Sequence, residues 1–214
     1  MTADSDTGAA LRTLDELGAK VDLIALNAQT VRTSIDVVSL VTAADLAKPT
    51  PCAGWTLHGL LAHMITQHYG FAAASRGEGD LSLWRLRPLG PDPVAEYRAA
   101  AEHVLASFAE DGVLERTFPL PEFTSAFEFS GAEAVSFHFI DYVVHSWDVA
   151  RTLGRTVCFD DDLLAAALPV AQVVPGGKAR LAPGAAFAPE VVWSGDSTLD
   201  EIVAILGRSP SWPE

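Results

Sequence analysis

The sequence is poor in cysteine, in basic residues and in long apolar runs, and each scarcity excludes a class of protein. Its 214 residues include two cysteines, Cys52 and Cys158, which form no Cys-x-x-Cys pair and supply no disulfide framework. No apolar run is long enough to span a bilayer, and the N-terminus lacks a basic segment followed by an apolar one. We therefore expect a cytoplasmic protein with reduced thiols.

Basic residues are half as frequent as acidic ones. Lys and Arg total 14 against 28 Asp and Glu, which gives a formal net charge of −14. Such a field repels a phosphate backbone or an anionic membrane surface, and no cluster of Lys and Arg interrupts it. We therefore expect neither nucleic acid nor membrane as a partner. If the protein has an active site, we expect its substrate to be a small molecule.

The apolar residues indicate a folded, mostly helical chain. Hydrophobic residues make up 49% and charged residues 20% of the sequence, a balance that excludes wholesale disorder. In several segments apolar residues recur at steps of three and four, as in helices that pack by one face. Long helices are predicted at about 11–41 (with Gly18 as a candidate break), 55–76, 94–109 and 131–153, and shorter ones at 163–173 and 197–206.

The connecting segments contain Pro and Gly or lack a period. Residues 81–90 and 175–189 indicate loops, 113–129 a long loop or a short irregular hairpin, and 191–193 a short strand. No repeat or linker divides the chain. We predict one all-α domain over 1–214, with four long antiparallel helices in a core bundle (about 8–154), an added fifth helix and a short C-terminal extension (about 155–214). Its leftover apolar faces leave room for a homodimer.

The segment 134–150 carries two chemically active side chains on one predicted helix. Asp141 and His145 stand four residues apart, which places both on one helix face. Asp141 lies inside the apolar run 139–144 with no Lys or Arg within a turn, so its carboxylate must be hydrogen-bonded, paired or metal-bound to offset desolvation. A carboxylate beside an imidazole forms half of a metal site or an acid–base pair.

His63 is the candidate for the other half. It lies within the apolar segment 60–65 of the second long helix, so we expect it to face the core or a pocket. A divalent cation held by His63, Asp141 and His145 would balance the buried carboxylate and leave coordination positions open for water or substrate. Taken alone, an inward histidine is more often a hydrogen-bonded core residue, and an Asp-x-x-x-His pair often arises by chance.

We expect the other histidines and acids either to support the three candidate ligands or to lie in solvent. His58 and His68 each lie five residues from His63, well off its azimuth, so we expect them at the surface or rim. His103 is expected in solvent.

His138 and Asp148 share the face of Asp141 and His145 and are candidates to support the ligands. Asp148 also precedes Arg151 by three residues, as in a helix-surface ion pair. The predicted loops at 81–90 and 113–129 would close over a pocket between the second and fourth long helices with aromatic residues. Core or anchor positions explain those aromatics equally well. They are Trp84, Phe118, Phe123 and Phe127.

Three motifs carry a family resemblance. They are PTPCAGWTL at 49–57 followed by LLAH at 60–63, DYVVHSWDVAR at 141–151, and GRSPSW at 207–212. Together they resemble the DinB-like metalloproteins, and within them the actinobacterial branch related to the N-terminal domain of mycothiol-dependent maleylpyruvate isomerase. The resemblance runs nearly end to end. This chain has Asp141 where the isomerase has a glutamate, and about sixty residues follow Gly154 where the isomerase carries a second C-terminal domain.

The resemblance implies a DinB-like four-helix bundle that holds a divalent metal, zinc or nickel, on His63, Asp141 and His145. It also implies a low-molecular-weight thiol cosubstrate such as mycothiol, whose pKa the metal would lower. We therefore expect a metal-dependent enzyme, a thiol-dependent transferase or isomerase, with the metal activating a thiol or water. Two alternatives stay open: a non-catalytic bundle that binds a metal or ligand, and a metal-independent acid–base isomerase or cyclase that uses Asp141 and His145.

Overall fold

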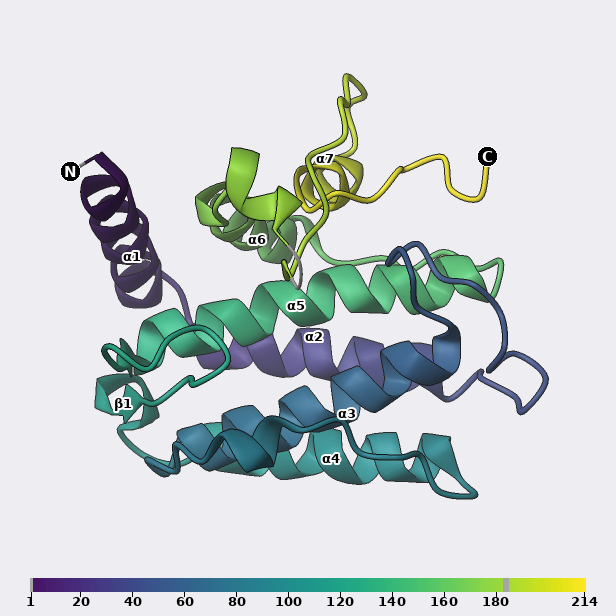
Figure 1. Ribbon diagram of the computed structural model, residues 1–214, viewed down its shortest axis with the longest axis horizontal. Coiled ribbons are helices and arrows are strands. Elements are labelled where there is room, and N and C mark those ends of the chain that lie inside the picture. The colour runs from purple at the N-terminus through teal and green to yellow at the C-terminus, as the bar shows by residue number, and fades with distance from the viewer. Residues whose placement is uncertain (1, 183–184) are drawn as a thin grey trace.

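Four long helices form the centre of the fold in the computed structural model, which describes residues 2–182 and 185–214 (Figure 1). They are α2 (Leu23–Val38), α3 (Leu57–Ala74), α4 (Pro93–Phe108) and α5 (Gly131–Thr152). α2 packs against α5 and α4, and α3 packs against α4 and α5. The mostly helical fold predicted from apolar periodicity is confirmed.

The direction of these helices differs from simple alternation. Figure 1 shows α3 and α4 running the same way, because the connection at 75–92 returns along their length. That connection contains the short 3-10 helix η1 (Leu81–Trp84). A long crossover of this kind is one of the known solutions for four-helix bundles. The antiparallel arrangement expected from the sequence is therefore wrong for this pair.

Three further helices cover one side of the bundle. α1 (Thr2–Lys20) and α6 (Asp161–Val173) pack against α5, and α7 (Thr198–Ile205) packs against α6. The first predicted helix is thus two, because Asp22 caps α2 by accepting a hydrogen bond from the Ala25 N–H at 2.9 Å. Gly18 lies within α1, where a Cβ would stand 2.9 Å from the Cβ of Ala132, so it permits close approach to α5 rather than breaking the helix.

A short hairpin connects α4 to α5. After the turn η2 (Val113–Glu115), β1 (Thr117–Phe118) pairs antiparallel with β2 (Phe129–Ser130), so the hairpin interpretation of 113–129 is the correct one. Ser130 then caps α5 in a capping box with Glu133. Within the described residues, 191–193 form no strand, although the Val191 N–H donates to the Ala204 carbonyl at 2.9 Å.

The α5 helix is the most enclosed element. Most of its residues are buried, because α1, α2, α3, α6 and the hairpin all pack on it. Over the part of the chain that the structure describes, no helix combines the length and apolar character needed to cross a bilayer.

The start of α5 leads to a stability prediction. A Cβ at Gly131 would lie 2.3 Å from the backbone oxygen of Val113, whereas one at Gly59, in the first turn of α3, would meet nothing closer than 3.9 Å. Backbone cannot yield as a flexible side chain does, so Gly131→Ala should lower the free energy of unfolding by about 1–3 kcal/mol. Gly59→Ala should be neutral or stabilising by up to about 1 kcal/mol. Urea denaturation of both variants checks this, and equal stabilities would contradict it.

Candidate metal centre

Two helices bring His63, Asp141 and His145 together. His63 lies on α3, and Asp141 and His145 lie one turn apart on α5. One potential ligand atom from each of the three lies within 4.8 Å of the others. His145 Nε2 is 3.2 Å from Asp141 Oδ1, and His63 Nε2 is 3.8 Å from Asp141 Oδ2. The sequence named these three residues together, and we call them the triad.

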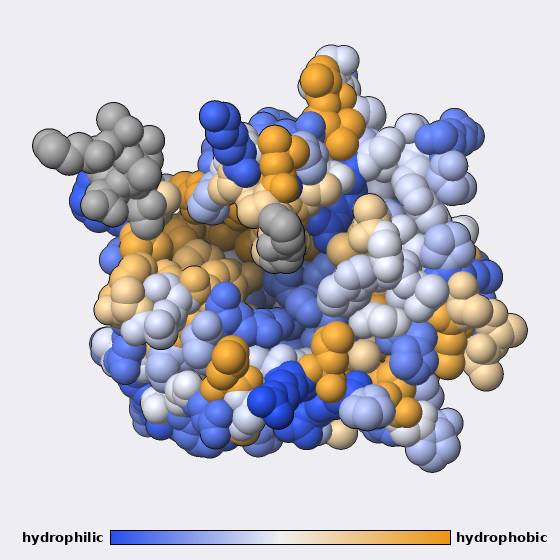
Figure 2. Space-filling model, in the orientation of Figure 1, coloured by the Kyte–Doolittle hydropathy of each residue, from blue (hydrophilic) through white to orange (hydrophobic). Residues whose placement is uncertain are grey.

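The triad lies at the edge of the core rather than deep within it. The side chains of His63 and Asp141 are 22% and 19% exposed, whereas that of His145 is 4% exposed. Trp55 covers His63 edge-on, with the ring centroids 4.8 Å apart. Figure 2 shows that this face of the molecule, on which α3 and α5 lie side by side, is hollowed near its middle with hydrophilic surface in the hollow. Small molecules can therefore reach the carboxylate and one imidazole.

A buried ion pair orients the His145 ring. Asp148 Oδ2 lies 2.9 Å from His145 Nδ1, and Arg208 Nη2 lies 3.2 Å from the same oxygen. The Asp148 and Arg208 side chains are 0% and 2% exposed. Because the Nδ1–H donates to Asp148, the Nε2 atom of His145 is directed at Asp141. A carboxylate behind a ligating imidazole is a recurrent feature of metal sites.

The sequence allowed two interpretations of Asp148, as a support for the ligands or as part of a surface ion pair, and the structure contradicts the second. The predicted surface ion pair with Arg151 is wrong: Asp148 is buried, and Arg151 instead donates to the backbone carbonyls of Pro210 and Trp212. Arg208, which carries the partner charge, belongs to the 207–212 motif, but its spacing from the triad in sequence gave no sign of its position. The fold around α6 and α7 brings it there.

The charges of the metal-free site balance one another. Burial raises the pKa of Asp141, but His145 and His63 lower it by more, so the pKa of this carboxyl lies well below its usual range. Burial lowers the pKa of His145, but Asp141 and Asp148 outweigh it and raise the pKa to about 10. Burial likewise raises the pKa of Asp148, and Arg208 and His145 lower it by more. A proton on His145 thus offsets the buried Asp141 charge, and a metal ion would replace that proton.

The donor set fits a divalent metal. Two imidazole nitrogens and a carboxylate oxygen are ligands that zinc and nickel accept, and three protein donors leave coordination positions open. The ring of His145 is already fixed by Asp148, and the side chains of His63 and Asp141 are partly exposed. The residues present therefore suit the group that the resemblance implies.

His138 belongs to a different cluster. Its Nδ1 lies 2.8 Å from Asn27 Oδ1, and its Nε2 lies 3.1 Å from His68 Nδ1. Asn27 Oδ1 can only accept, so each histidine donates from Nδ1 and the rings form a directed chain. Burial lowers the pKa of His138 to about 3 and that of His68 well below its usual value, so both rings are neutral. Among the described residues, the polar contacts of His138 are with this cluster rather than with the triad.

The surface position expected for His68 is wrong. Its side chain is fully buried and stacks on Tyr142, with the centroids 4.0 Å apart. The azimuth argument failed because α3 is covered by α4, α5 and η1 and therefore has more than one buried face. His58 and His103 are exposed as expected.

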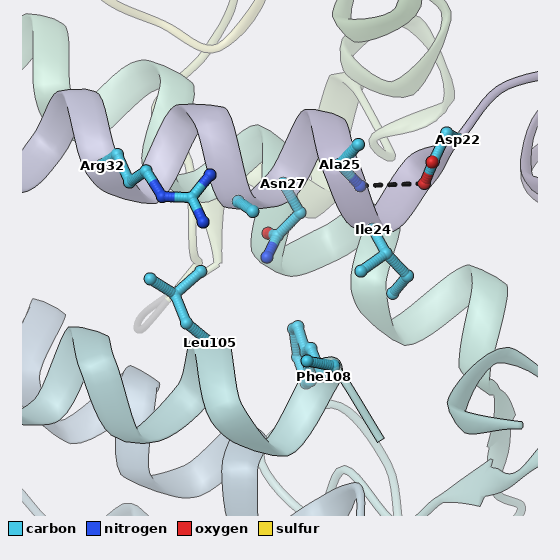
Figure 3. Close-up of a pocket in the computed structure, with 9 residues that line it drawn as sticks. Asp22, Ile24, Ala25, Asn27, Arg32, Leu105 and Phe108 are labelled. Carbon is cyan, nitrogen blue, oxygen red and sulfur yellow. Dashed lines mark hydrogen bonds between the residues drawn. The ribbon is translucent and has the colours of Figure 1, made fainter. Parts of the chain in front are cut away.

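A pocket of about 330 Å³ lies between α2 and α4. Figure 3 shows Asn27 directed into the space between these helices, with Ile24, Arg32, Leu105 and Phe108 around it. The pocket shares no residue with the triad. Asn27 lines this pocket and also belongs to the neutral histidine cluster, so the pocket is separate from the candidate metal centre.

Comparison with known proteins gives a family, two curated relatives and a structural likeness. A family profile described as "Mycothiol maleylpyruvate isomerase N-terminal domain" matches residues 28–150, more than half of the chain. Two uncharacterized proteins of Mycobacterium tuberculosis, Rv0738 of strain H37Rv and MT0763 of strain CDC 1551, are each 29% identical over 175 residues, covering 79% of this chain and 88% of theirs.

The crystal structure of the mycothiol-dependent maleylpyruvate isomerase is similar with a TM-score of 0.54 and 16% identity, over 70% of this chain. A histidine-to-alanine mutant of that isomerase matches with the same TM-score at 15% identity. The match spans 66% of the isomerase's length, slightly less than two thirds. At this identity the likeness concerns the fold.

Replacing Asp148 should weaken metal binding through His145. In Asp148→Asn the imidazole loses its carboxylate partner, and the zinc dissociation constant should rise about 10- to 100-fold. Competition with a chromogenic chelator measures the constant, and circular dichroism checks the fold. Asp162→Asn, an exposed acid in the first turn of α6, is the matched control and should bind zinc like the unaltered protein. Unchanged affinity in Asp148→Asn would contradict the orienting role.

Zinc binding should also release a proton. Because the pKa of His145 is raised to about 10, its ring is protonated at pH 8 in the metal-free protein, and a ligand must be deprotonated. We expect release of about one proton per zinc and about a tenfold rise in apparent affinity per pH unit between pH 7 and 9. Calorimetry in buffers of different ionisation enthalpy counts the protons. An affinity independent of pH would exclude His145 as a ligand.

Proposed function

Because the chain belongs to the mycothiol maleylpyruvate isomerase N-terminal domain family, we propose that it is a metal-dependent enzyme that acts on a small molecule with a thiol cosubstrate. The reaction class is thiol-dependent transfer or isomerisation, and mycothiol is the thiol that the family name suggests. The carrying observation is the convergence of three donor atoms within 4.8 Å, contributed by α3 and α5, with two of the three side chains partly exposed.

The triad has distinct roles in this proposal. His63, Asp141 and His145 would hold zinc or nickel, and a bound metal would supply a lowered pKa to a thiol or water at the site. Asp141 neutralises part of the cationic charge from a position that is 19% exposed. His63 comes from the other helix, so a metal held by all three residues would bridge α3 and α5.

Asp148 and Arg208 are positioning residues. They keep the His145 ring in one orientation and, being buried, they hold that orientation without competition from water. Trp55 limits the access of water to His63 on one side. These contacts prepare the site before any small molecule arrives, which reduces the reorganisation required during a reaction.

A second candidate is a metal-independent acid–base enzyme. The observation in its favour is the metal-free ion pair, in which the protonated His145 lies 3.2 Å from the ionised Asp141. His145 would then act as a general acid for isomerisation or cyclisation. Full turnover after exhaustive chelation would favour this candidate, whereas restoration of turnover by zinc or nickel would favour the first.

His63→Ala tests the metal assignment. With only two donors left on α5, the variant should lose stoichiometric metal by elemental analysis while its helical circular dichroism stays unchanged. His58→Ala removes an exposed histidine from the same helix and should keep its metal. Retention of one metal per chain in His63→Ala would overturn the ligand set.

A thiol assay separates an enzyme from a bundle that only binds. The metal-loaded protein is incubated with mycothiol and a panel of small electrophiles, and loss of free thiol (transfer) and loss of the starting electrophile (isomerisation, which regenerates the thiol) are both followed against a no-protein control. We expect turnover in the unaltered protein and loss of at least about a hundredfold in His63→Ala, because metal-assisted activation of the nucleophile is removed. Absence of turnover with any electrophile would favour the non-catalytic alternative.

A further inference from the structure

One loop is attached to both helices that carry the triad. On α3, Gln67 follows His63 by four residues, so the two are neighbours on the helix surface. The Gln67 side chain is nearly buried and donates from Nε2 to Glu122 Oε2 at 2.8 Å. Glu122 belongs to the loop 119–128 between β1 and β2. The loop is therefore held one helical turn from His63.

The same loop is attached to α5 by aromatic stacking. Phe137 precedes Asp141 by four residues, so these two are also surface neighbours. The Phe123 ring stacks on Phe137 with the centroids 5.3 Å apart and the planes 13° apart. Leu120, which is fully buried, anchors the loop, and its carbonyl accepts from the Phe123 N–H at 2.9 Å. The loop thus spans α3 and α5 at one end of the triad.

The rings on this loop form a cluster that the fold leaves partly open. Phe129 is buried and lies between the others, with centroid distances of 6.0 Å to Phe123, 5.0 Å to Phe127 and 5.3 Å to Phe137. Phe123 and Phe127 are each 49% exposed. By contrast Trp84 and Phe118, the other aromatics predicted to close the site, are core residues at 3% and 0% exposure. We call Phe123, Phe127, Phe129 and Phe137 the aromatic wall.

Figure 2 shows hydrophobic surface along the left side of the hollow, at the height where Figure 1 places α1 and the start of α5. An exposed cluster of large apolar side chains beside a polar hollow is typical of a ligand-binding surface. The aromatic wall thus offers exposed flat apolar faces about one helical turn from the triad.

We propose that the aromatic wall binds a planar, apolar ring of the small molecule on which the triad acts; the position of this subsite rests on the proposed function. Aromatic faces prefer offset-stacked or edge-on rings. The net charge of −14 and the nearby Glu122 disfavour a substrate with several negative charges. The substrate class is therefore a ring-bearing molecule with at most one carboxylate, and Phe123 is a specificity-determining residue.

A pair of matched ligands tests the ring preference without turnover. Cinnamate and crotonate are both unsaturated monocarboxylates, and they differ by a phenyl against a methyl group. Calorimetric titration of the zinc-loaded full chain should give an affinity for cinnamate about tenfold higher, since the phenyl group stacks on the wall. Phe123→Ala should remove most of that preference and leave the crotonate affinity unchanged. Phe123→Leu, which keeps apolar volume without a flat ring, should be intermediate.

The control is Leu40→Ala, which removes another large exposed apolar side chain, 55% exposed, just beyond the end of α2. It should keep the full cinnamate preference. Equal affinities for the two acids in the unaltered protein, or an undiminished preference in folded Phe123→Ala, would overturn the proposal. Zinc binding is measured separately, and its failure contradicts the proposed function. The titration with the two acids is then repeated on metal-free protein, where the ring preference should persist because the wall contains no metal ligand.

Discussion

The buried carboxylate of Asp148 is the contact on which the candidate site depends. It joins His145 of α5 to Arg208, which follows α7, and both charged partners are almost fully buried. Removing either partner would leave an uncompensated charge in the interior, which is far more costly than losing a surface ion pair. The C-terminal extension therefore takes part in the site through Arg208, in addition to covering the bundle.

Two histidines on α5 show how the surroundings decide protonation. His145 is flanked by Asp141 and Asp148, and its pKa is raised to about 10. His138, two turns earlier, meets the neutral side chains of Asn27 and His68, and burial lowers its pKa to about 3. One helix thus carries a charged, partly exposed site and a neutral hydrogen-bonded cluster in the core. In the proposed function the first would exchange a proton for a metal ion, whereas the second adds a directed polar contact between α2, α3 and α5.

The sequence predicted the helices and the pairing of Asp141 with His145 because both depend on local spacing, whereas His63 was chosen from its apolar surroundings and the family resemblance. Apolar residues at steps of three and four located α3, α4 and α5 within a few residues, and four-residue spacing placed Asp141 and His145 together. Features that depend on distant segments were missed. The buried position of His68 follows from three elements packing on α3, and the contact between Arg208 and Asp148 closes about sixty residues of chain. The parallel course of α3 and α4 follows from the path of the 75–92 connection, which contains no motif that fixes it.

The position of Arg208 in the chain has a consequence for synthesis. His63, Asp141 and His145 all precede it, and the last of them is made about sixty residues earlier. At ribosomal rates of roughly 5–20 residues per second, the ligands exist for on the order of 3–12 s before Arg208 is added. During that interval Asp148, the partner of His145 on the same helix, lacks its cation. The charge balance of the candidate site is therefore completed only after α7 has been made.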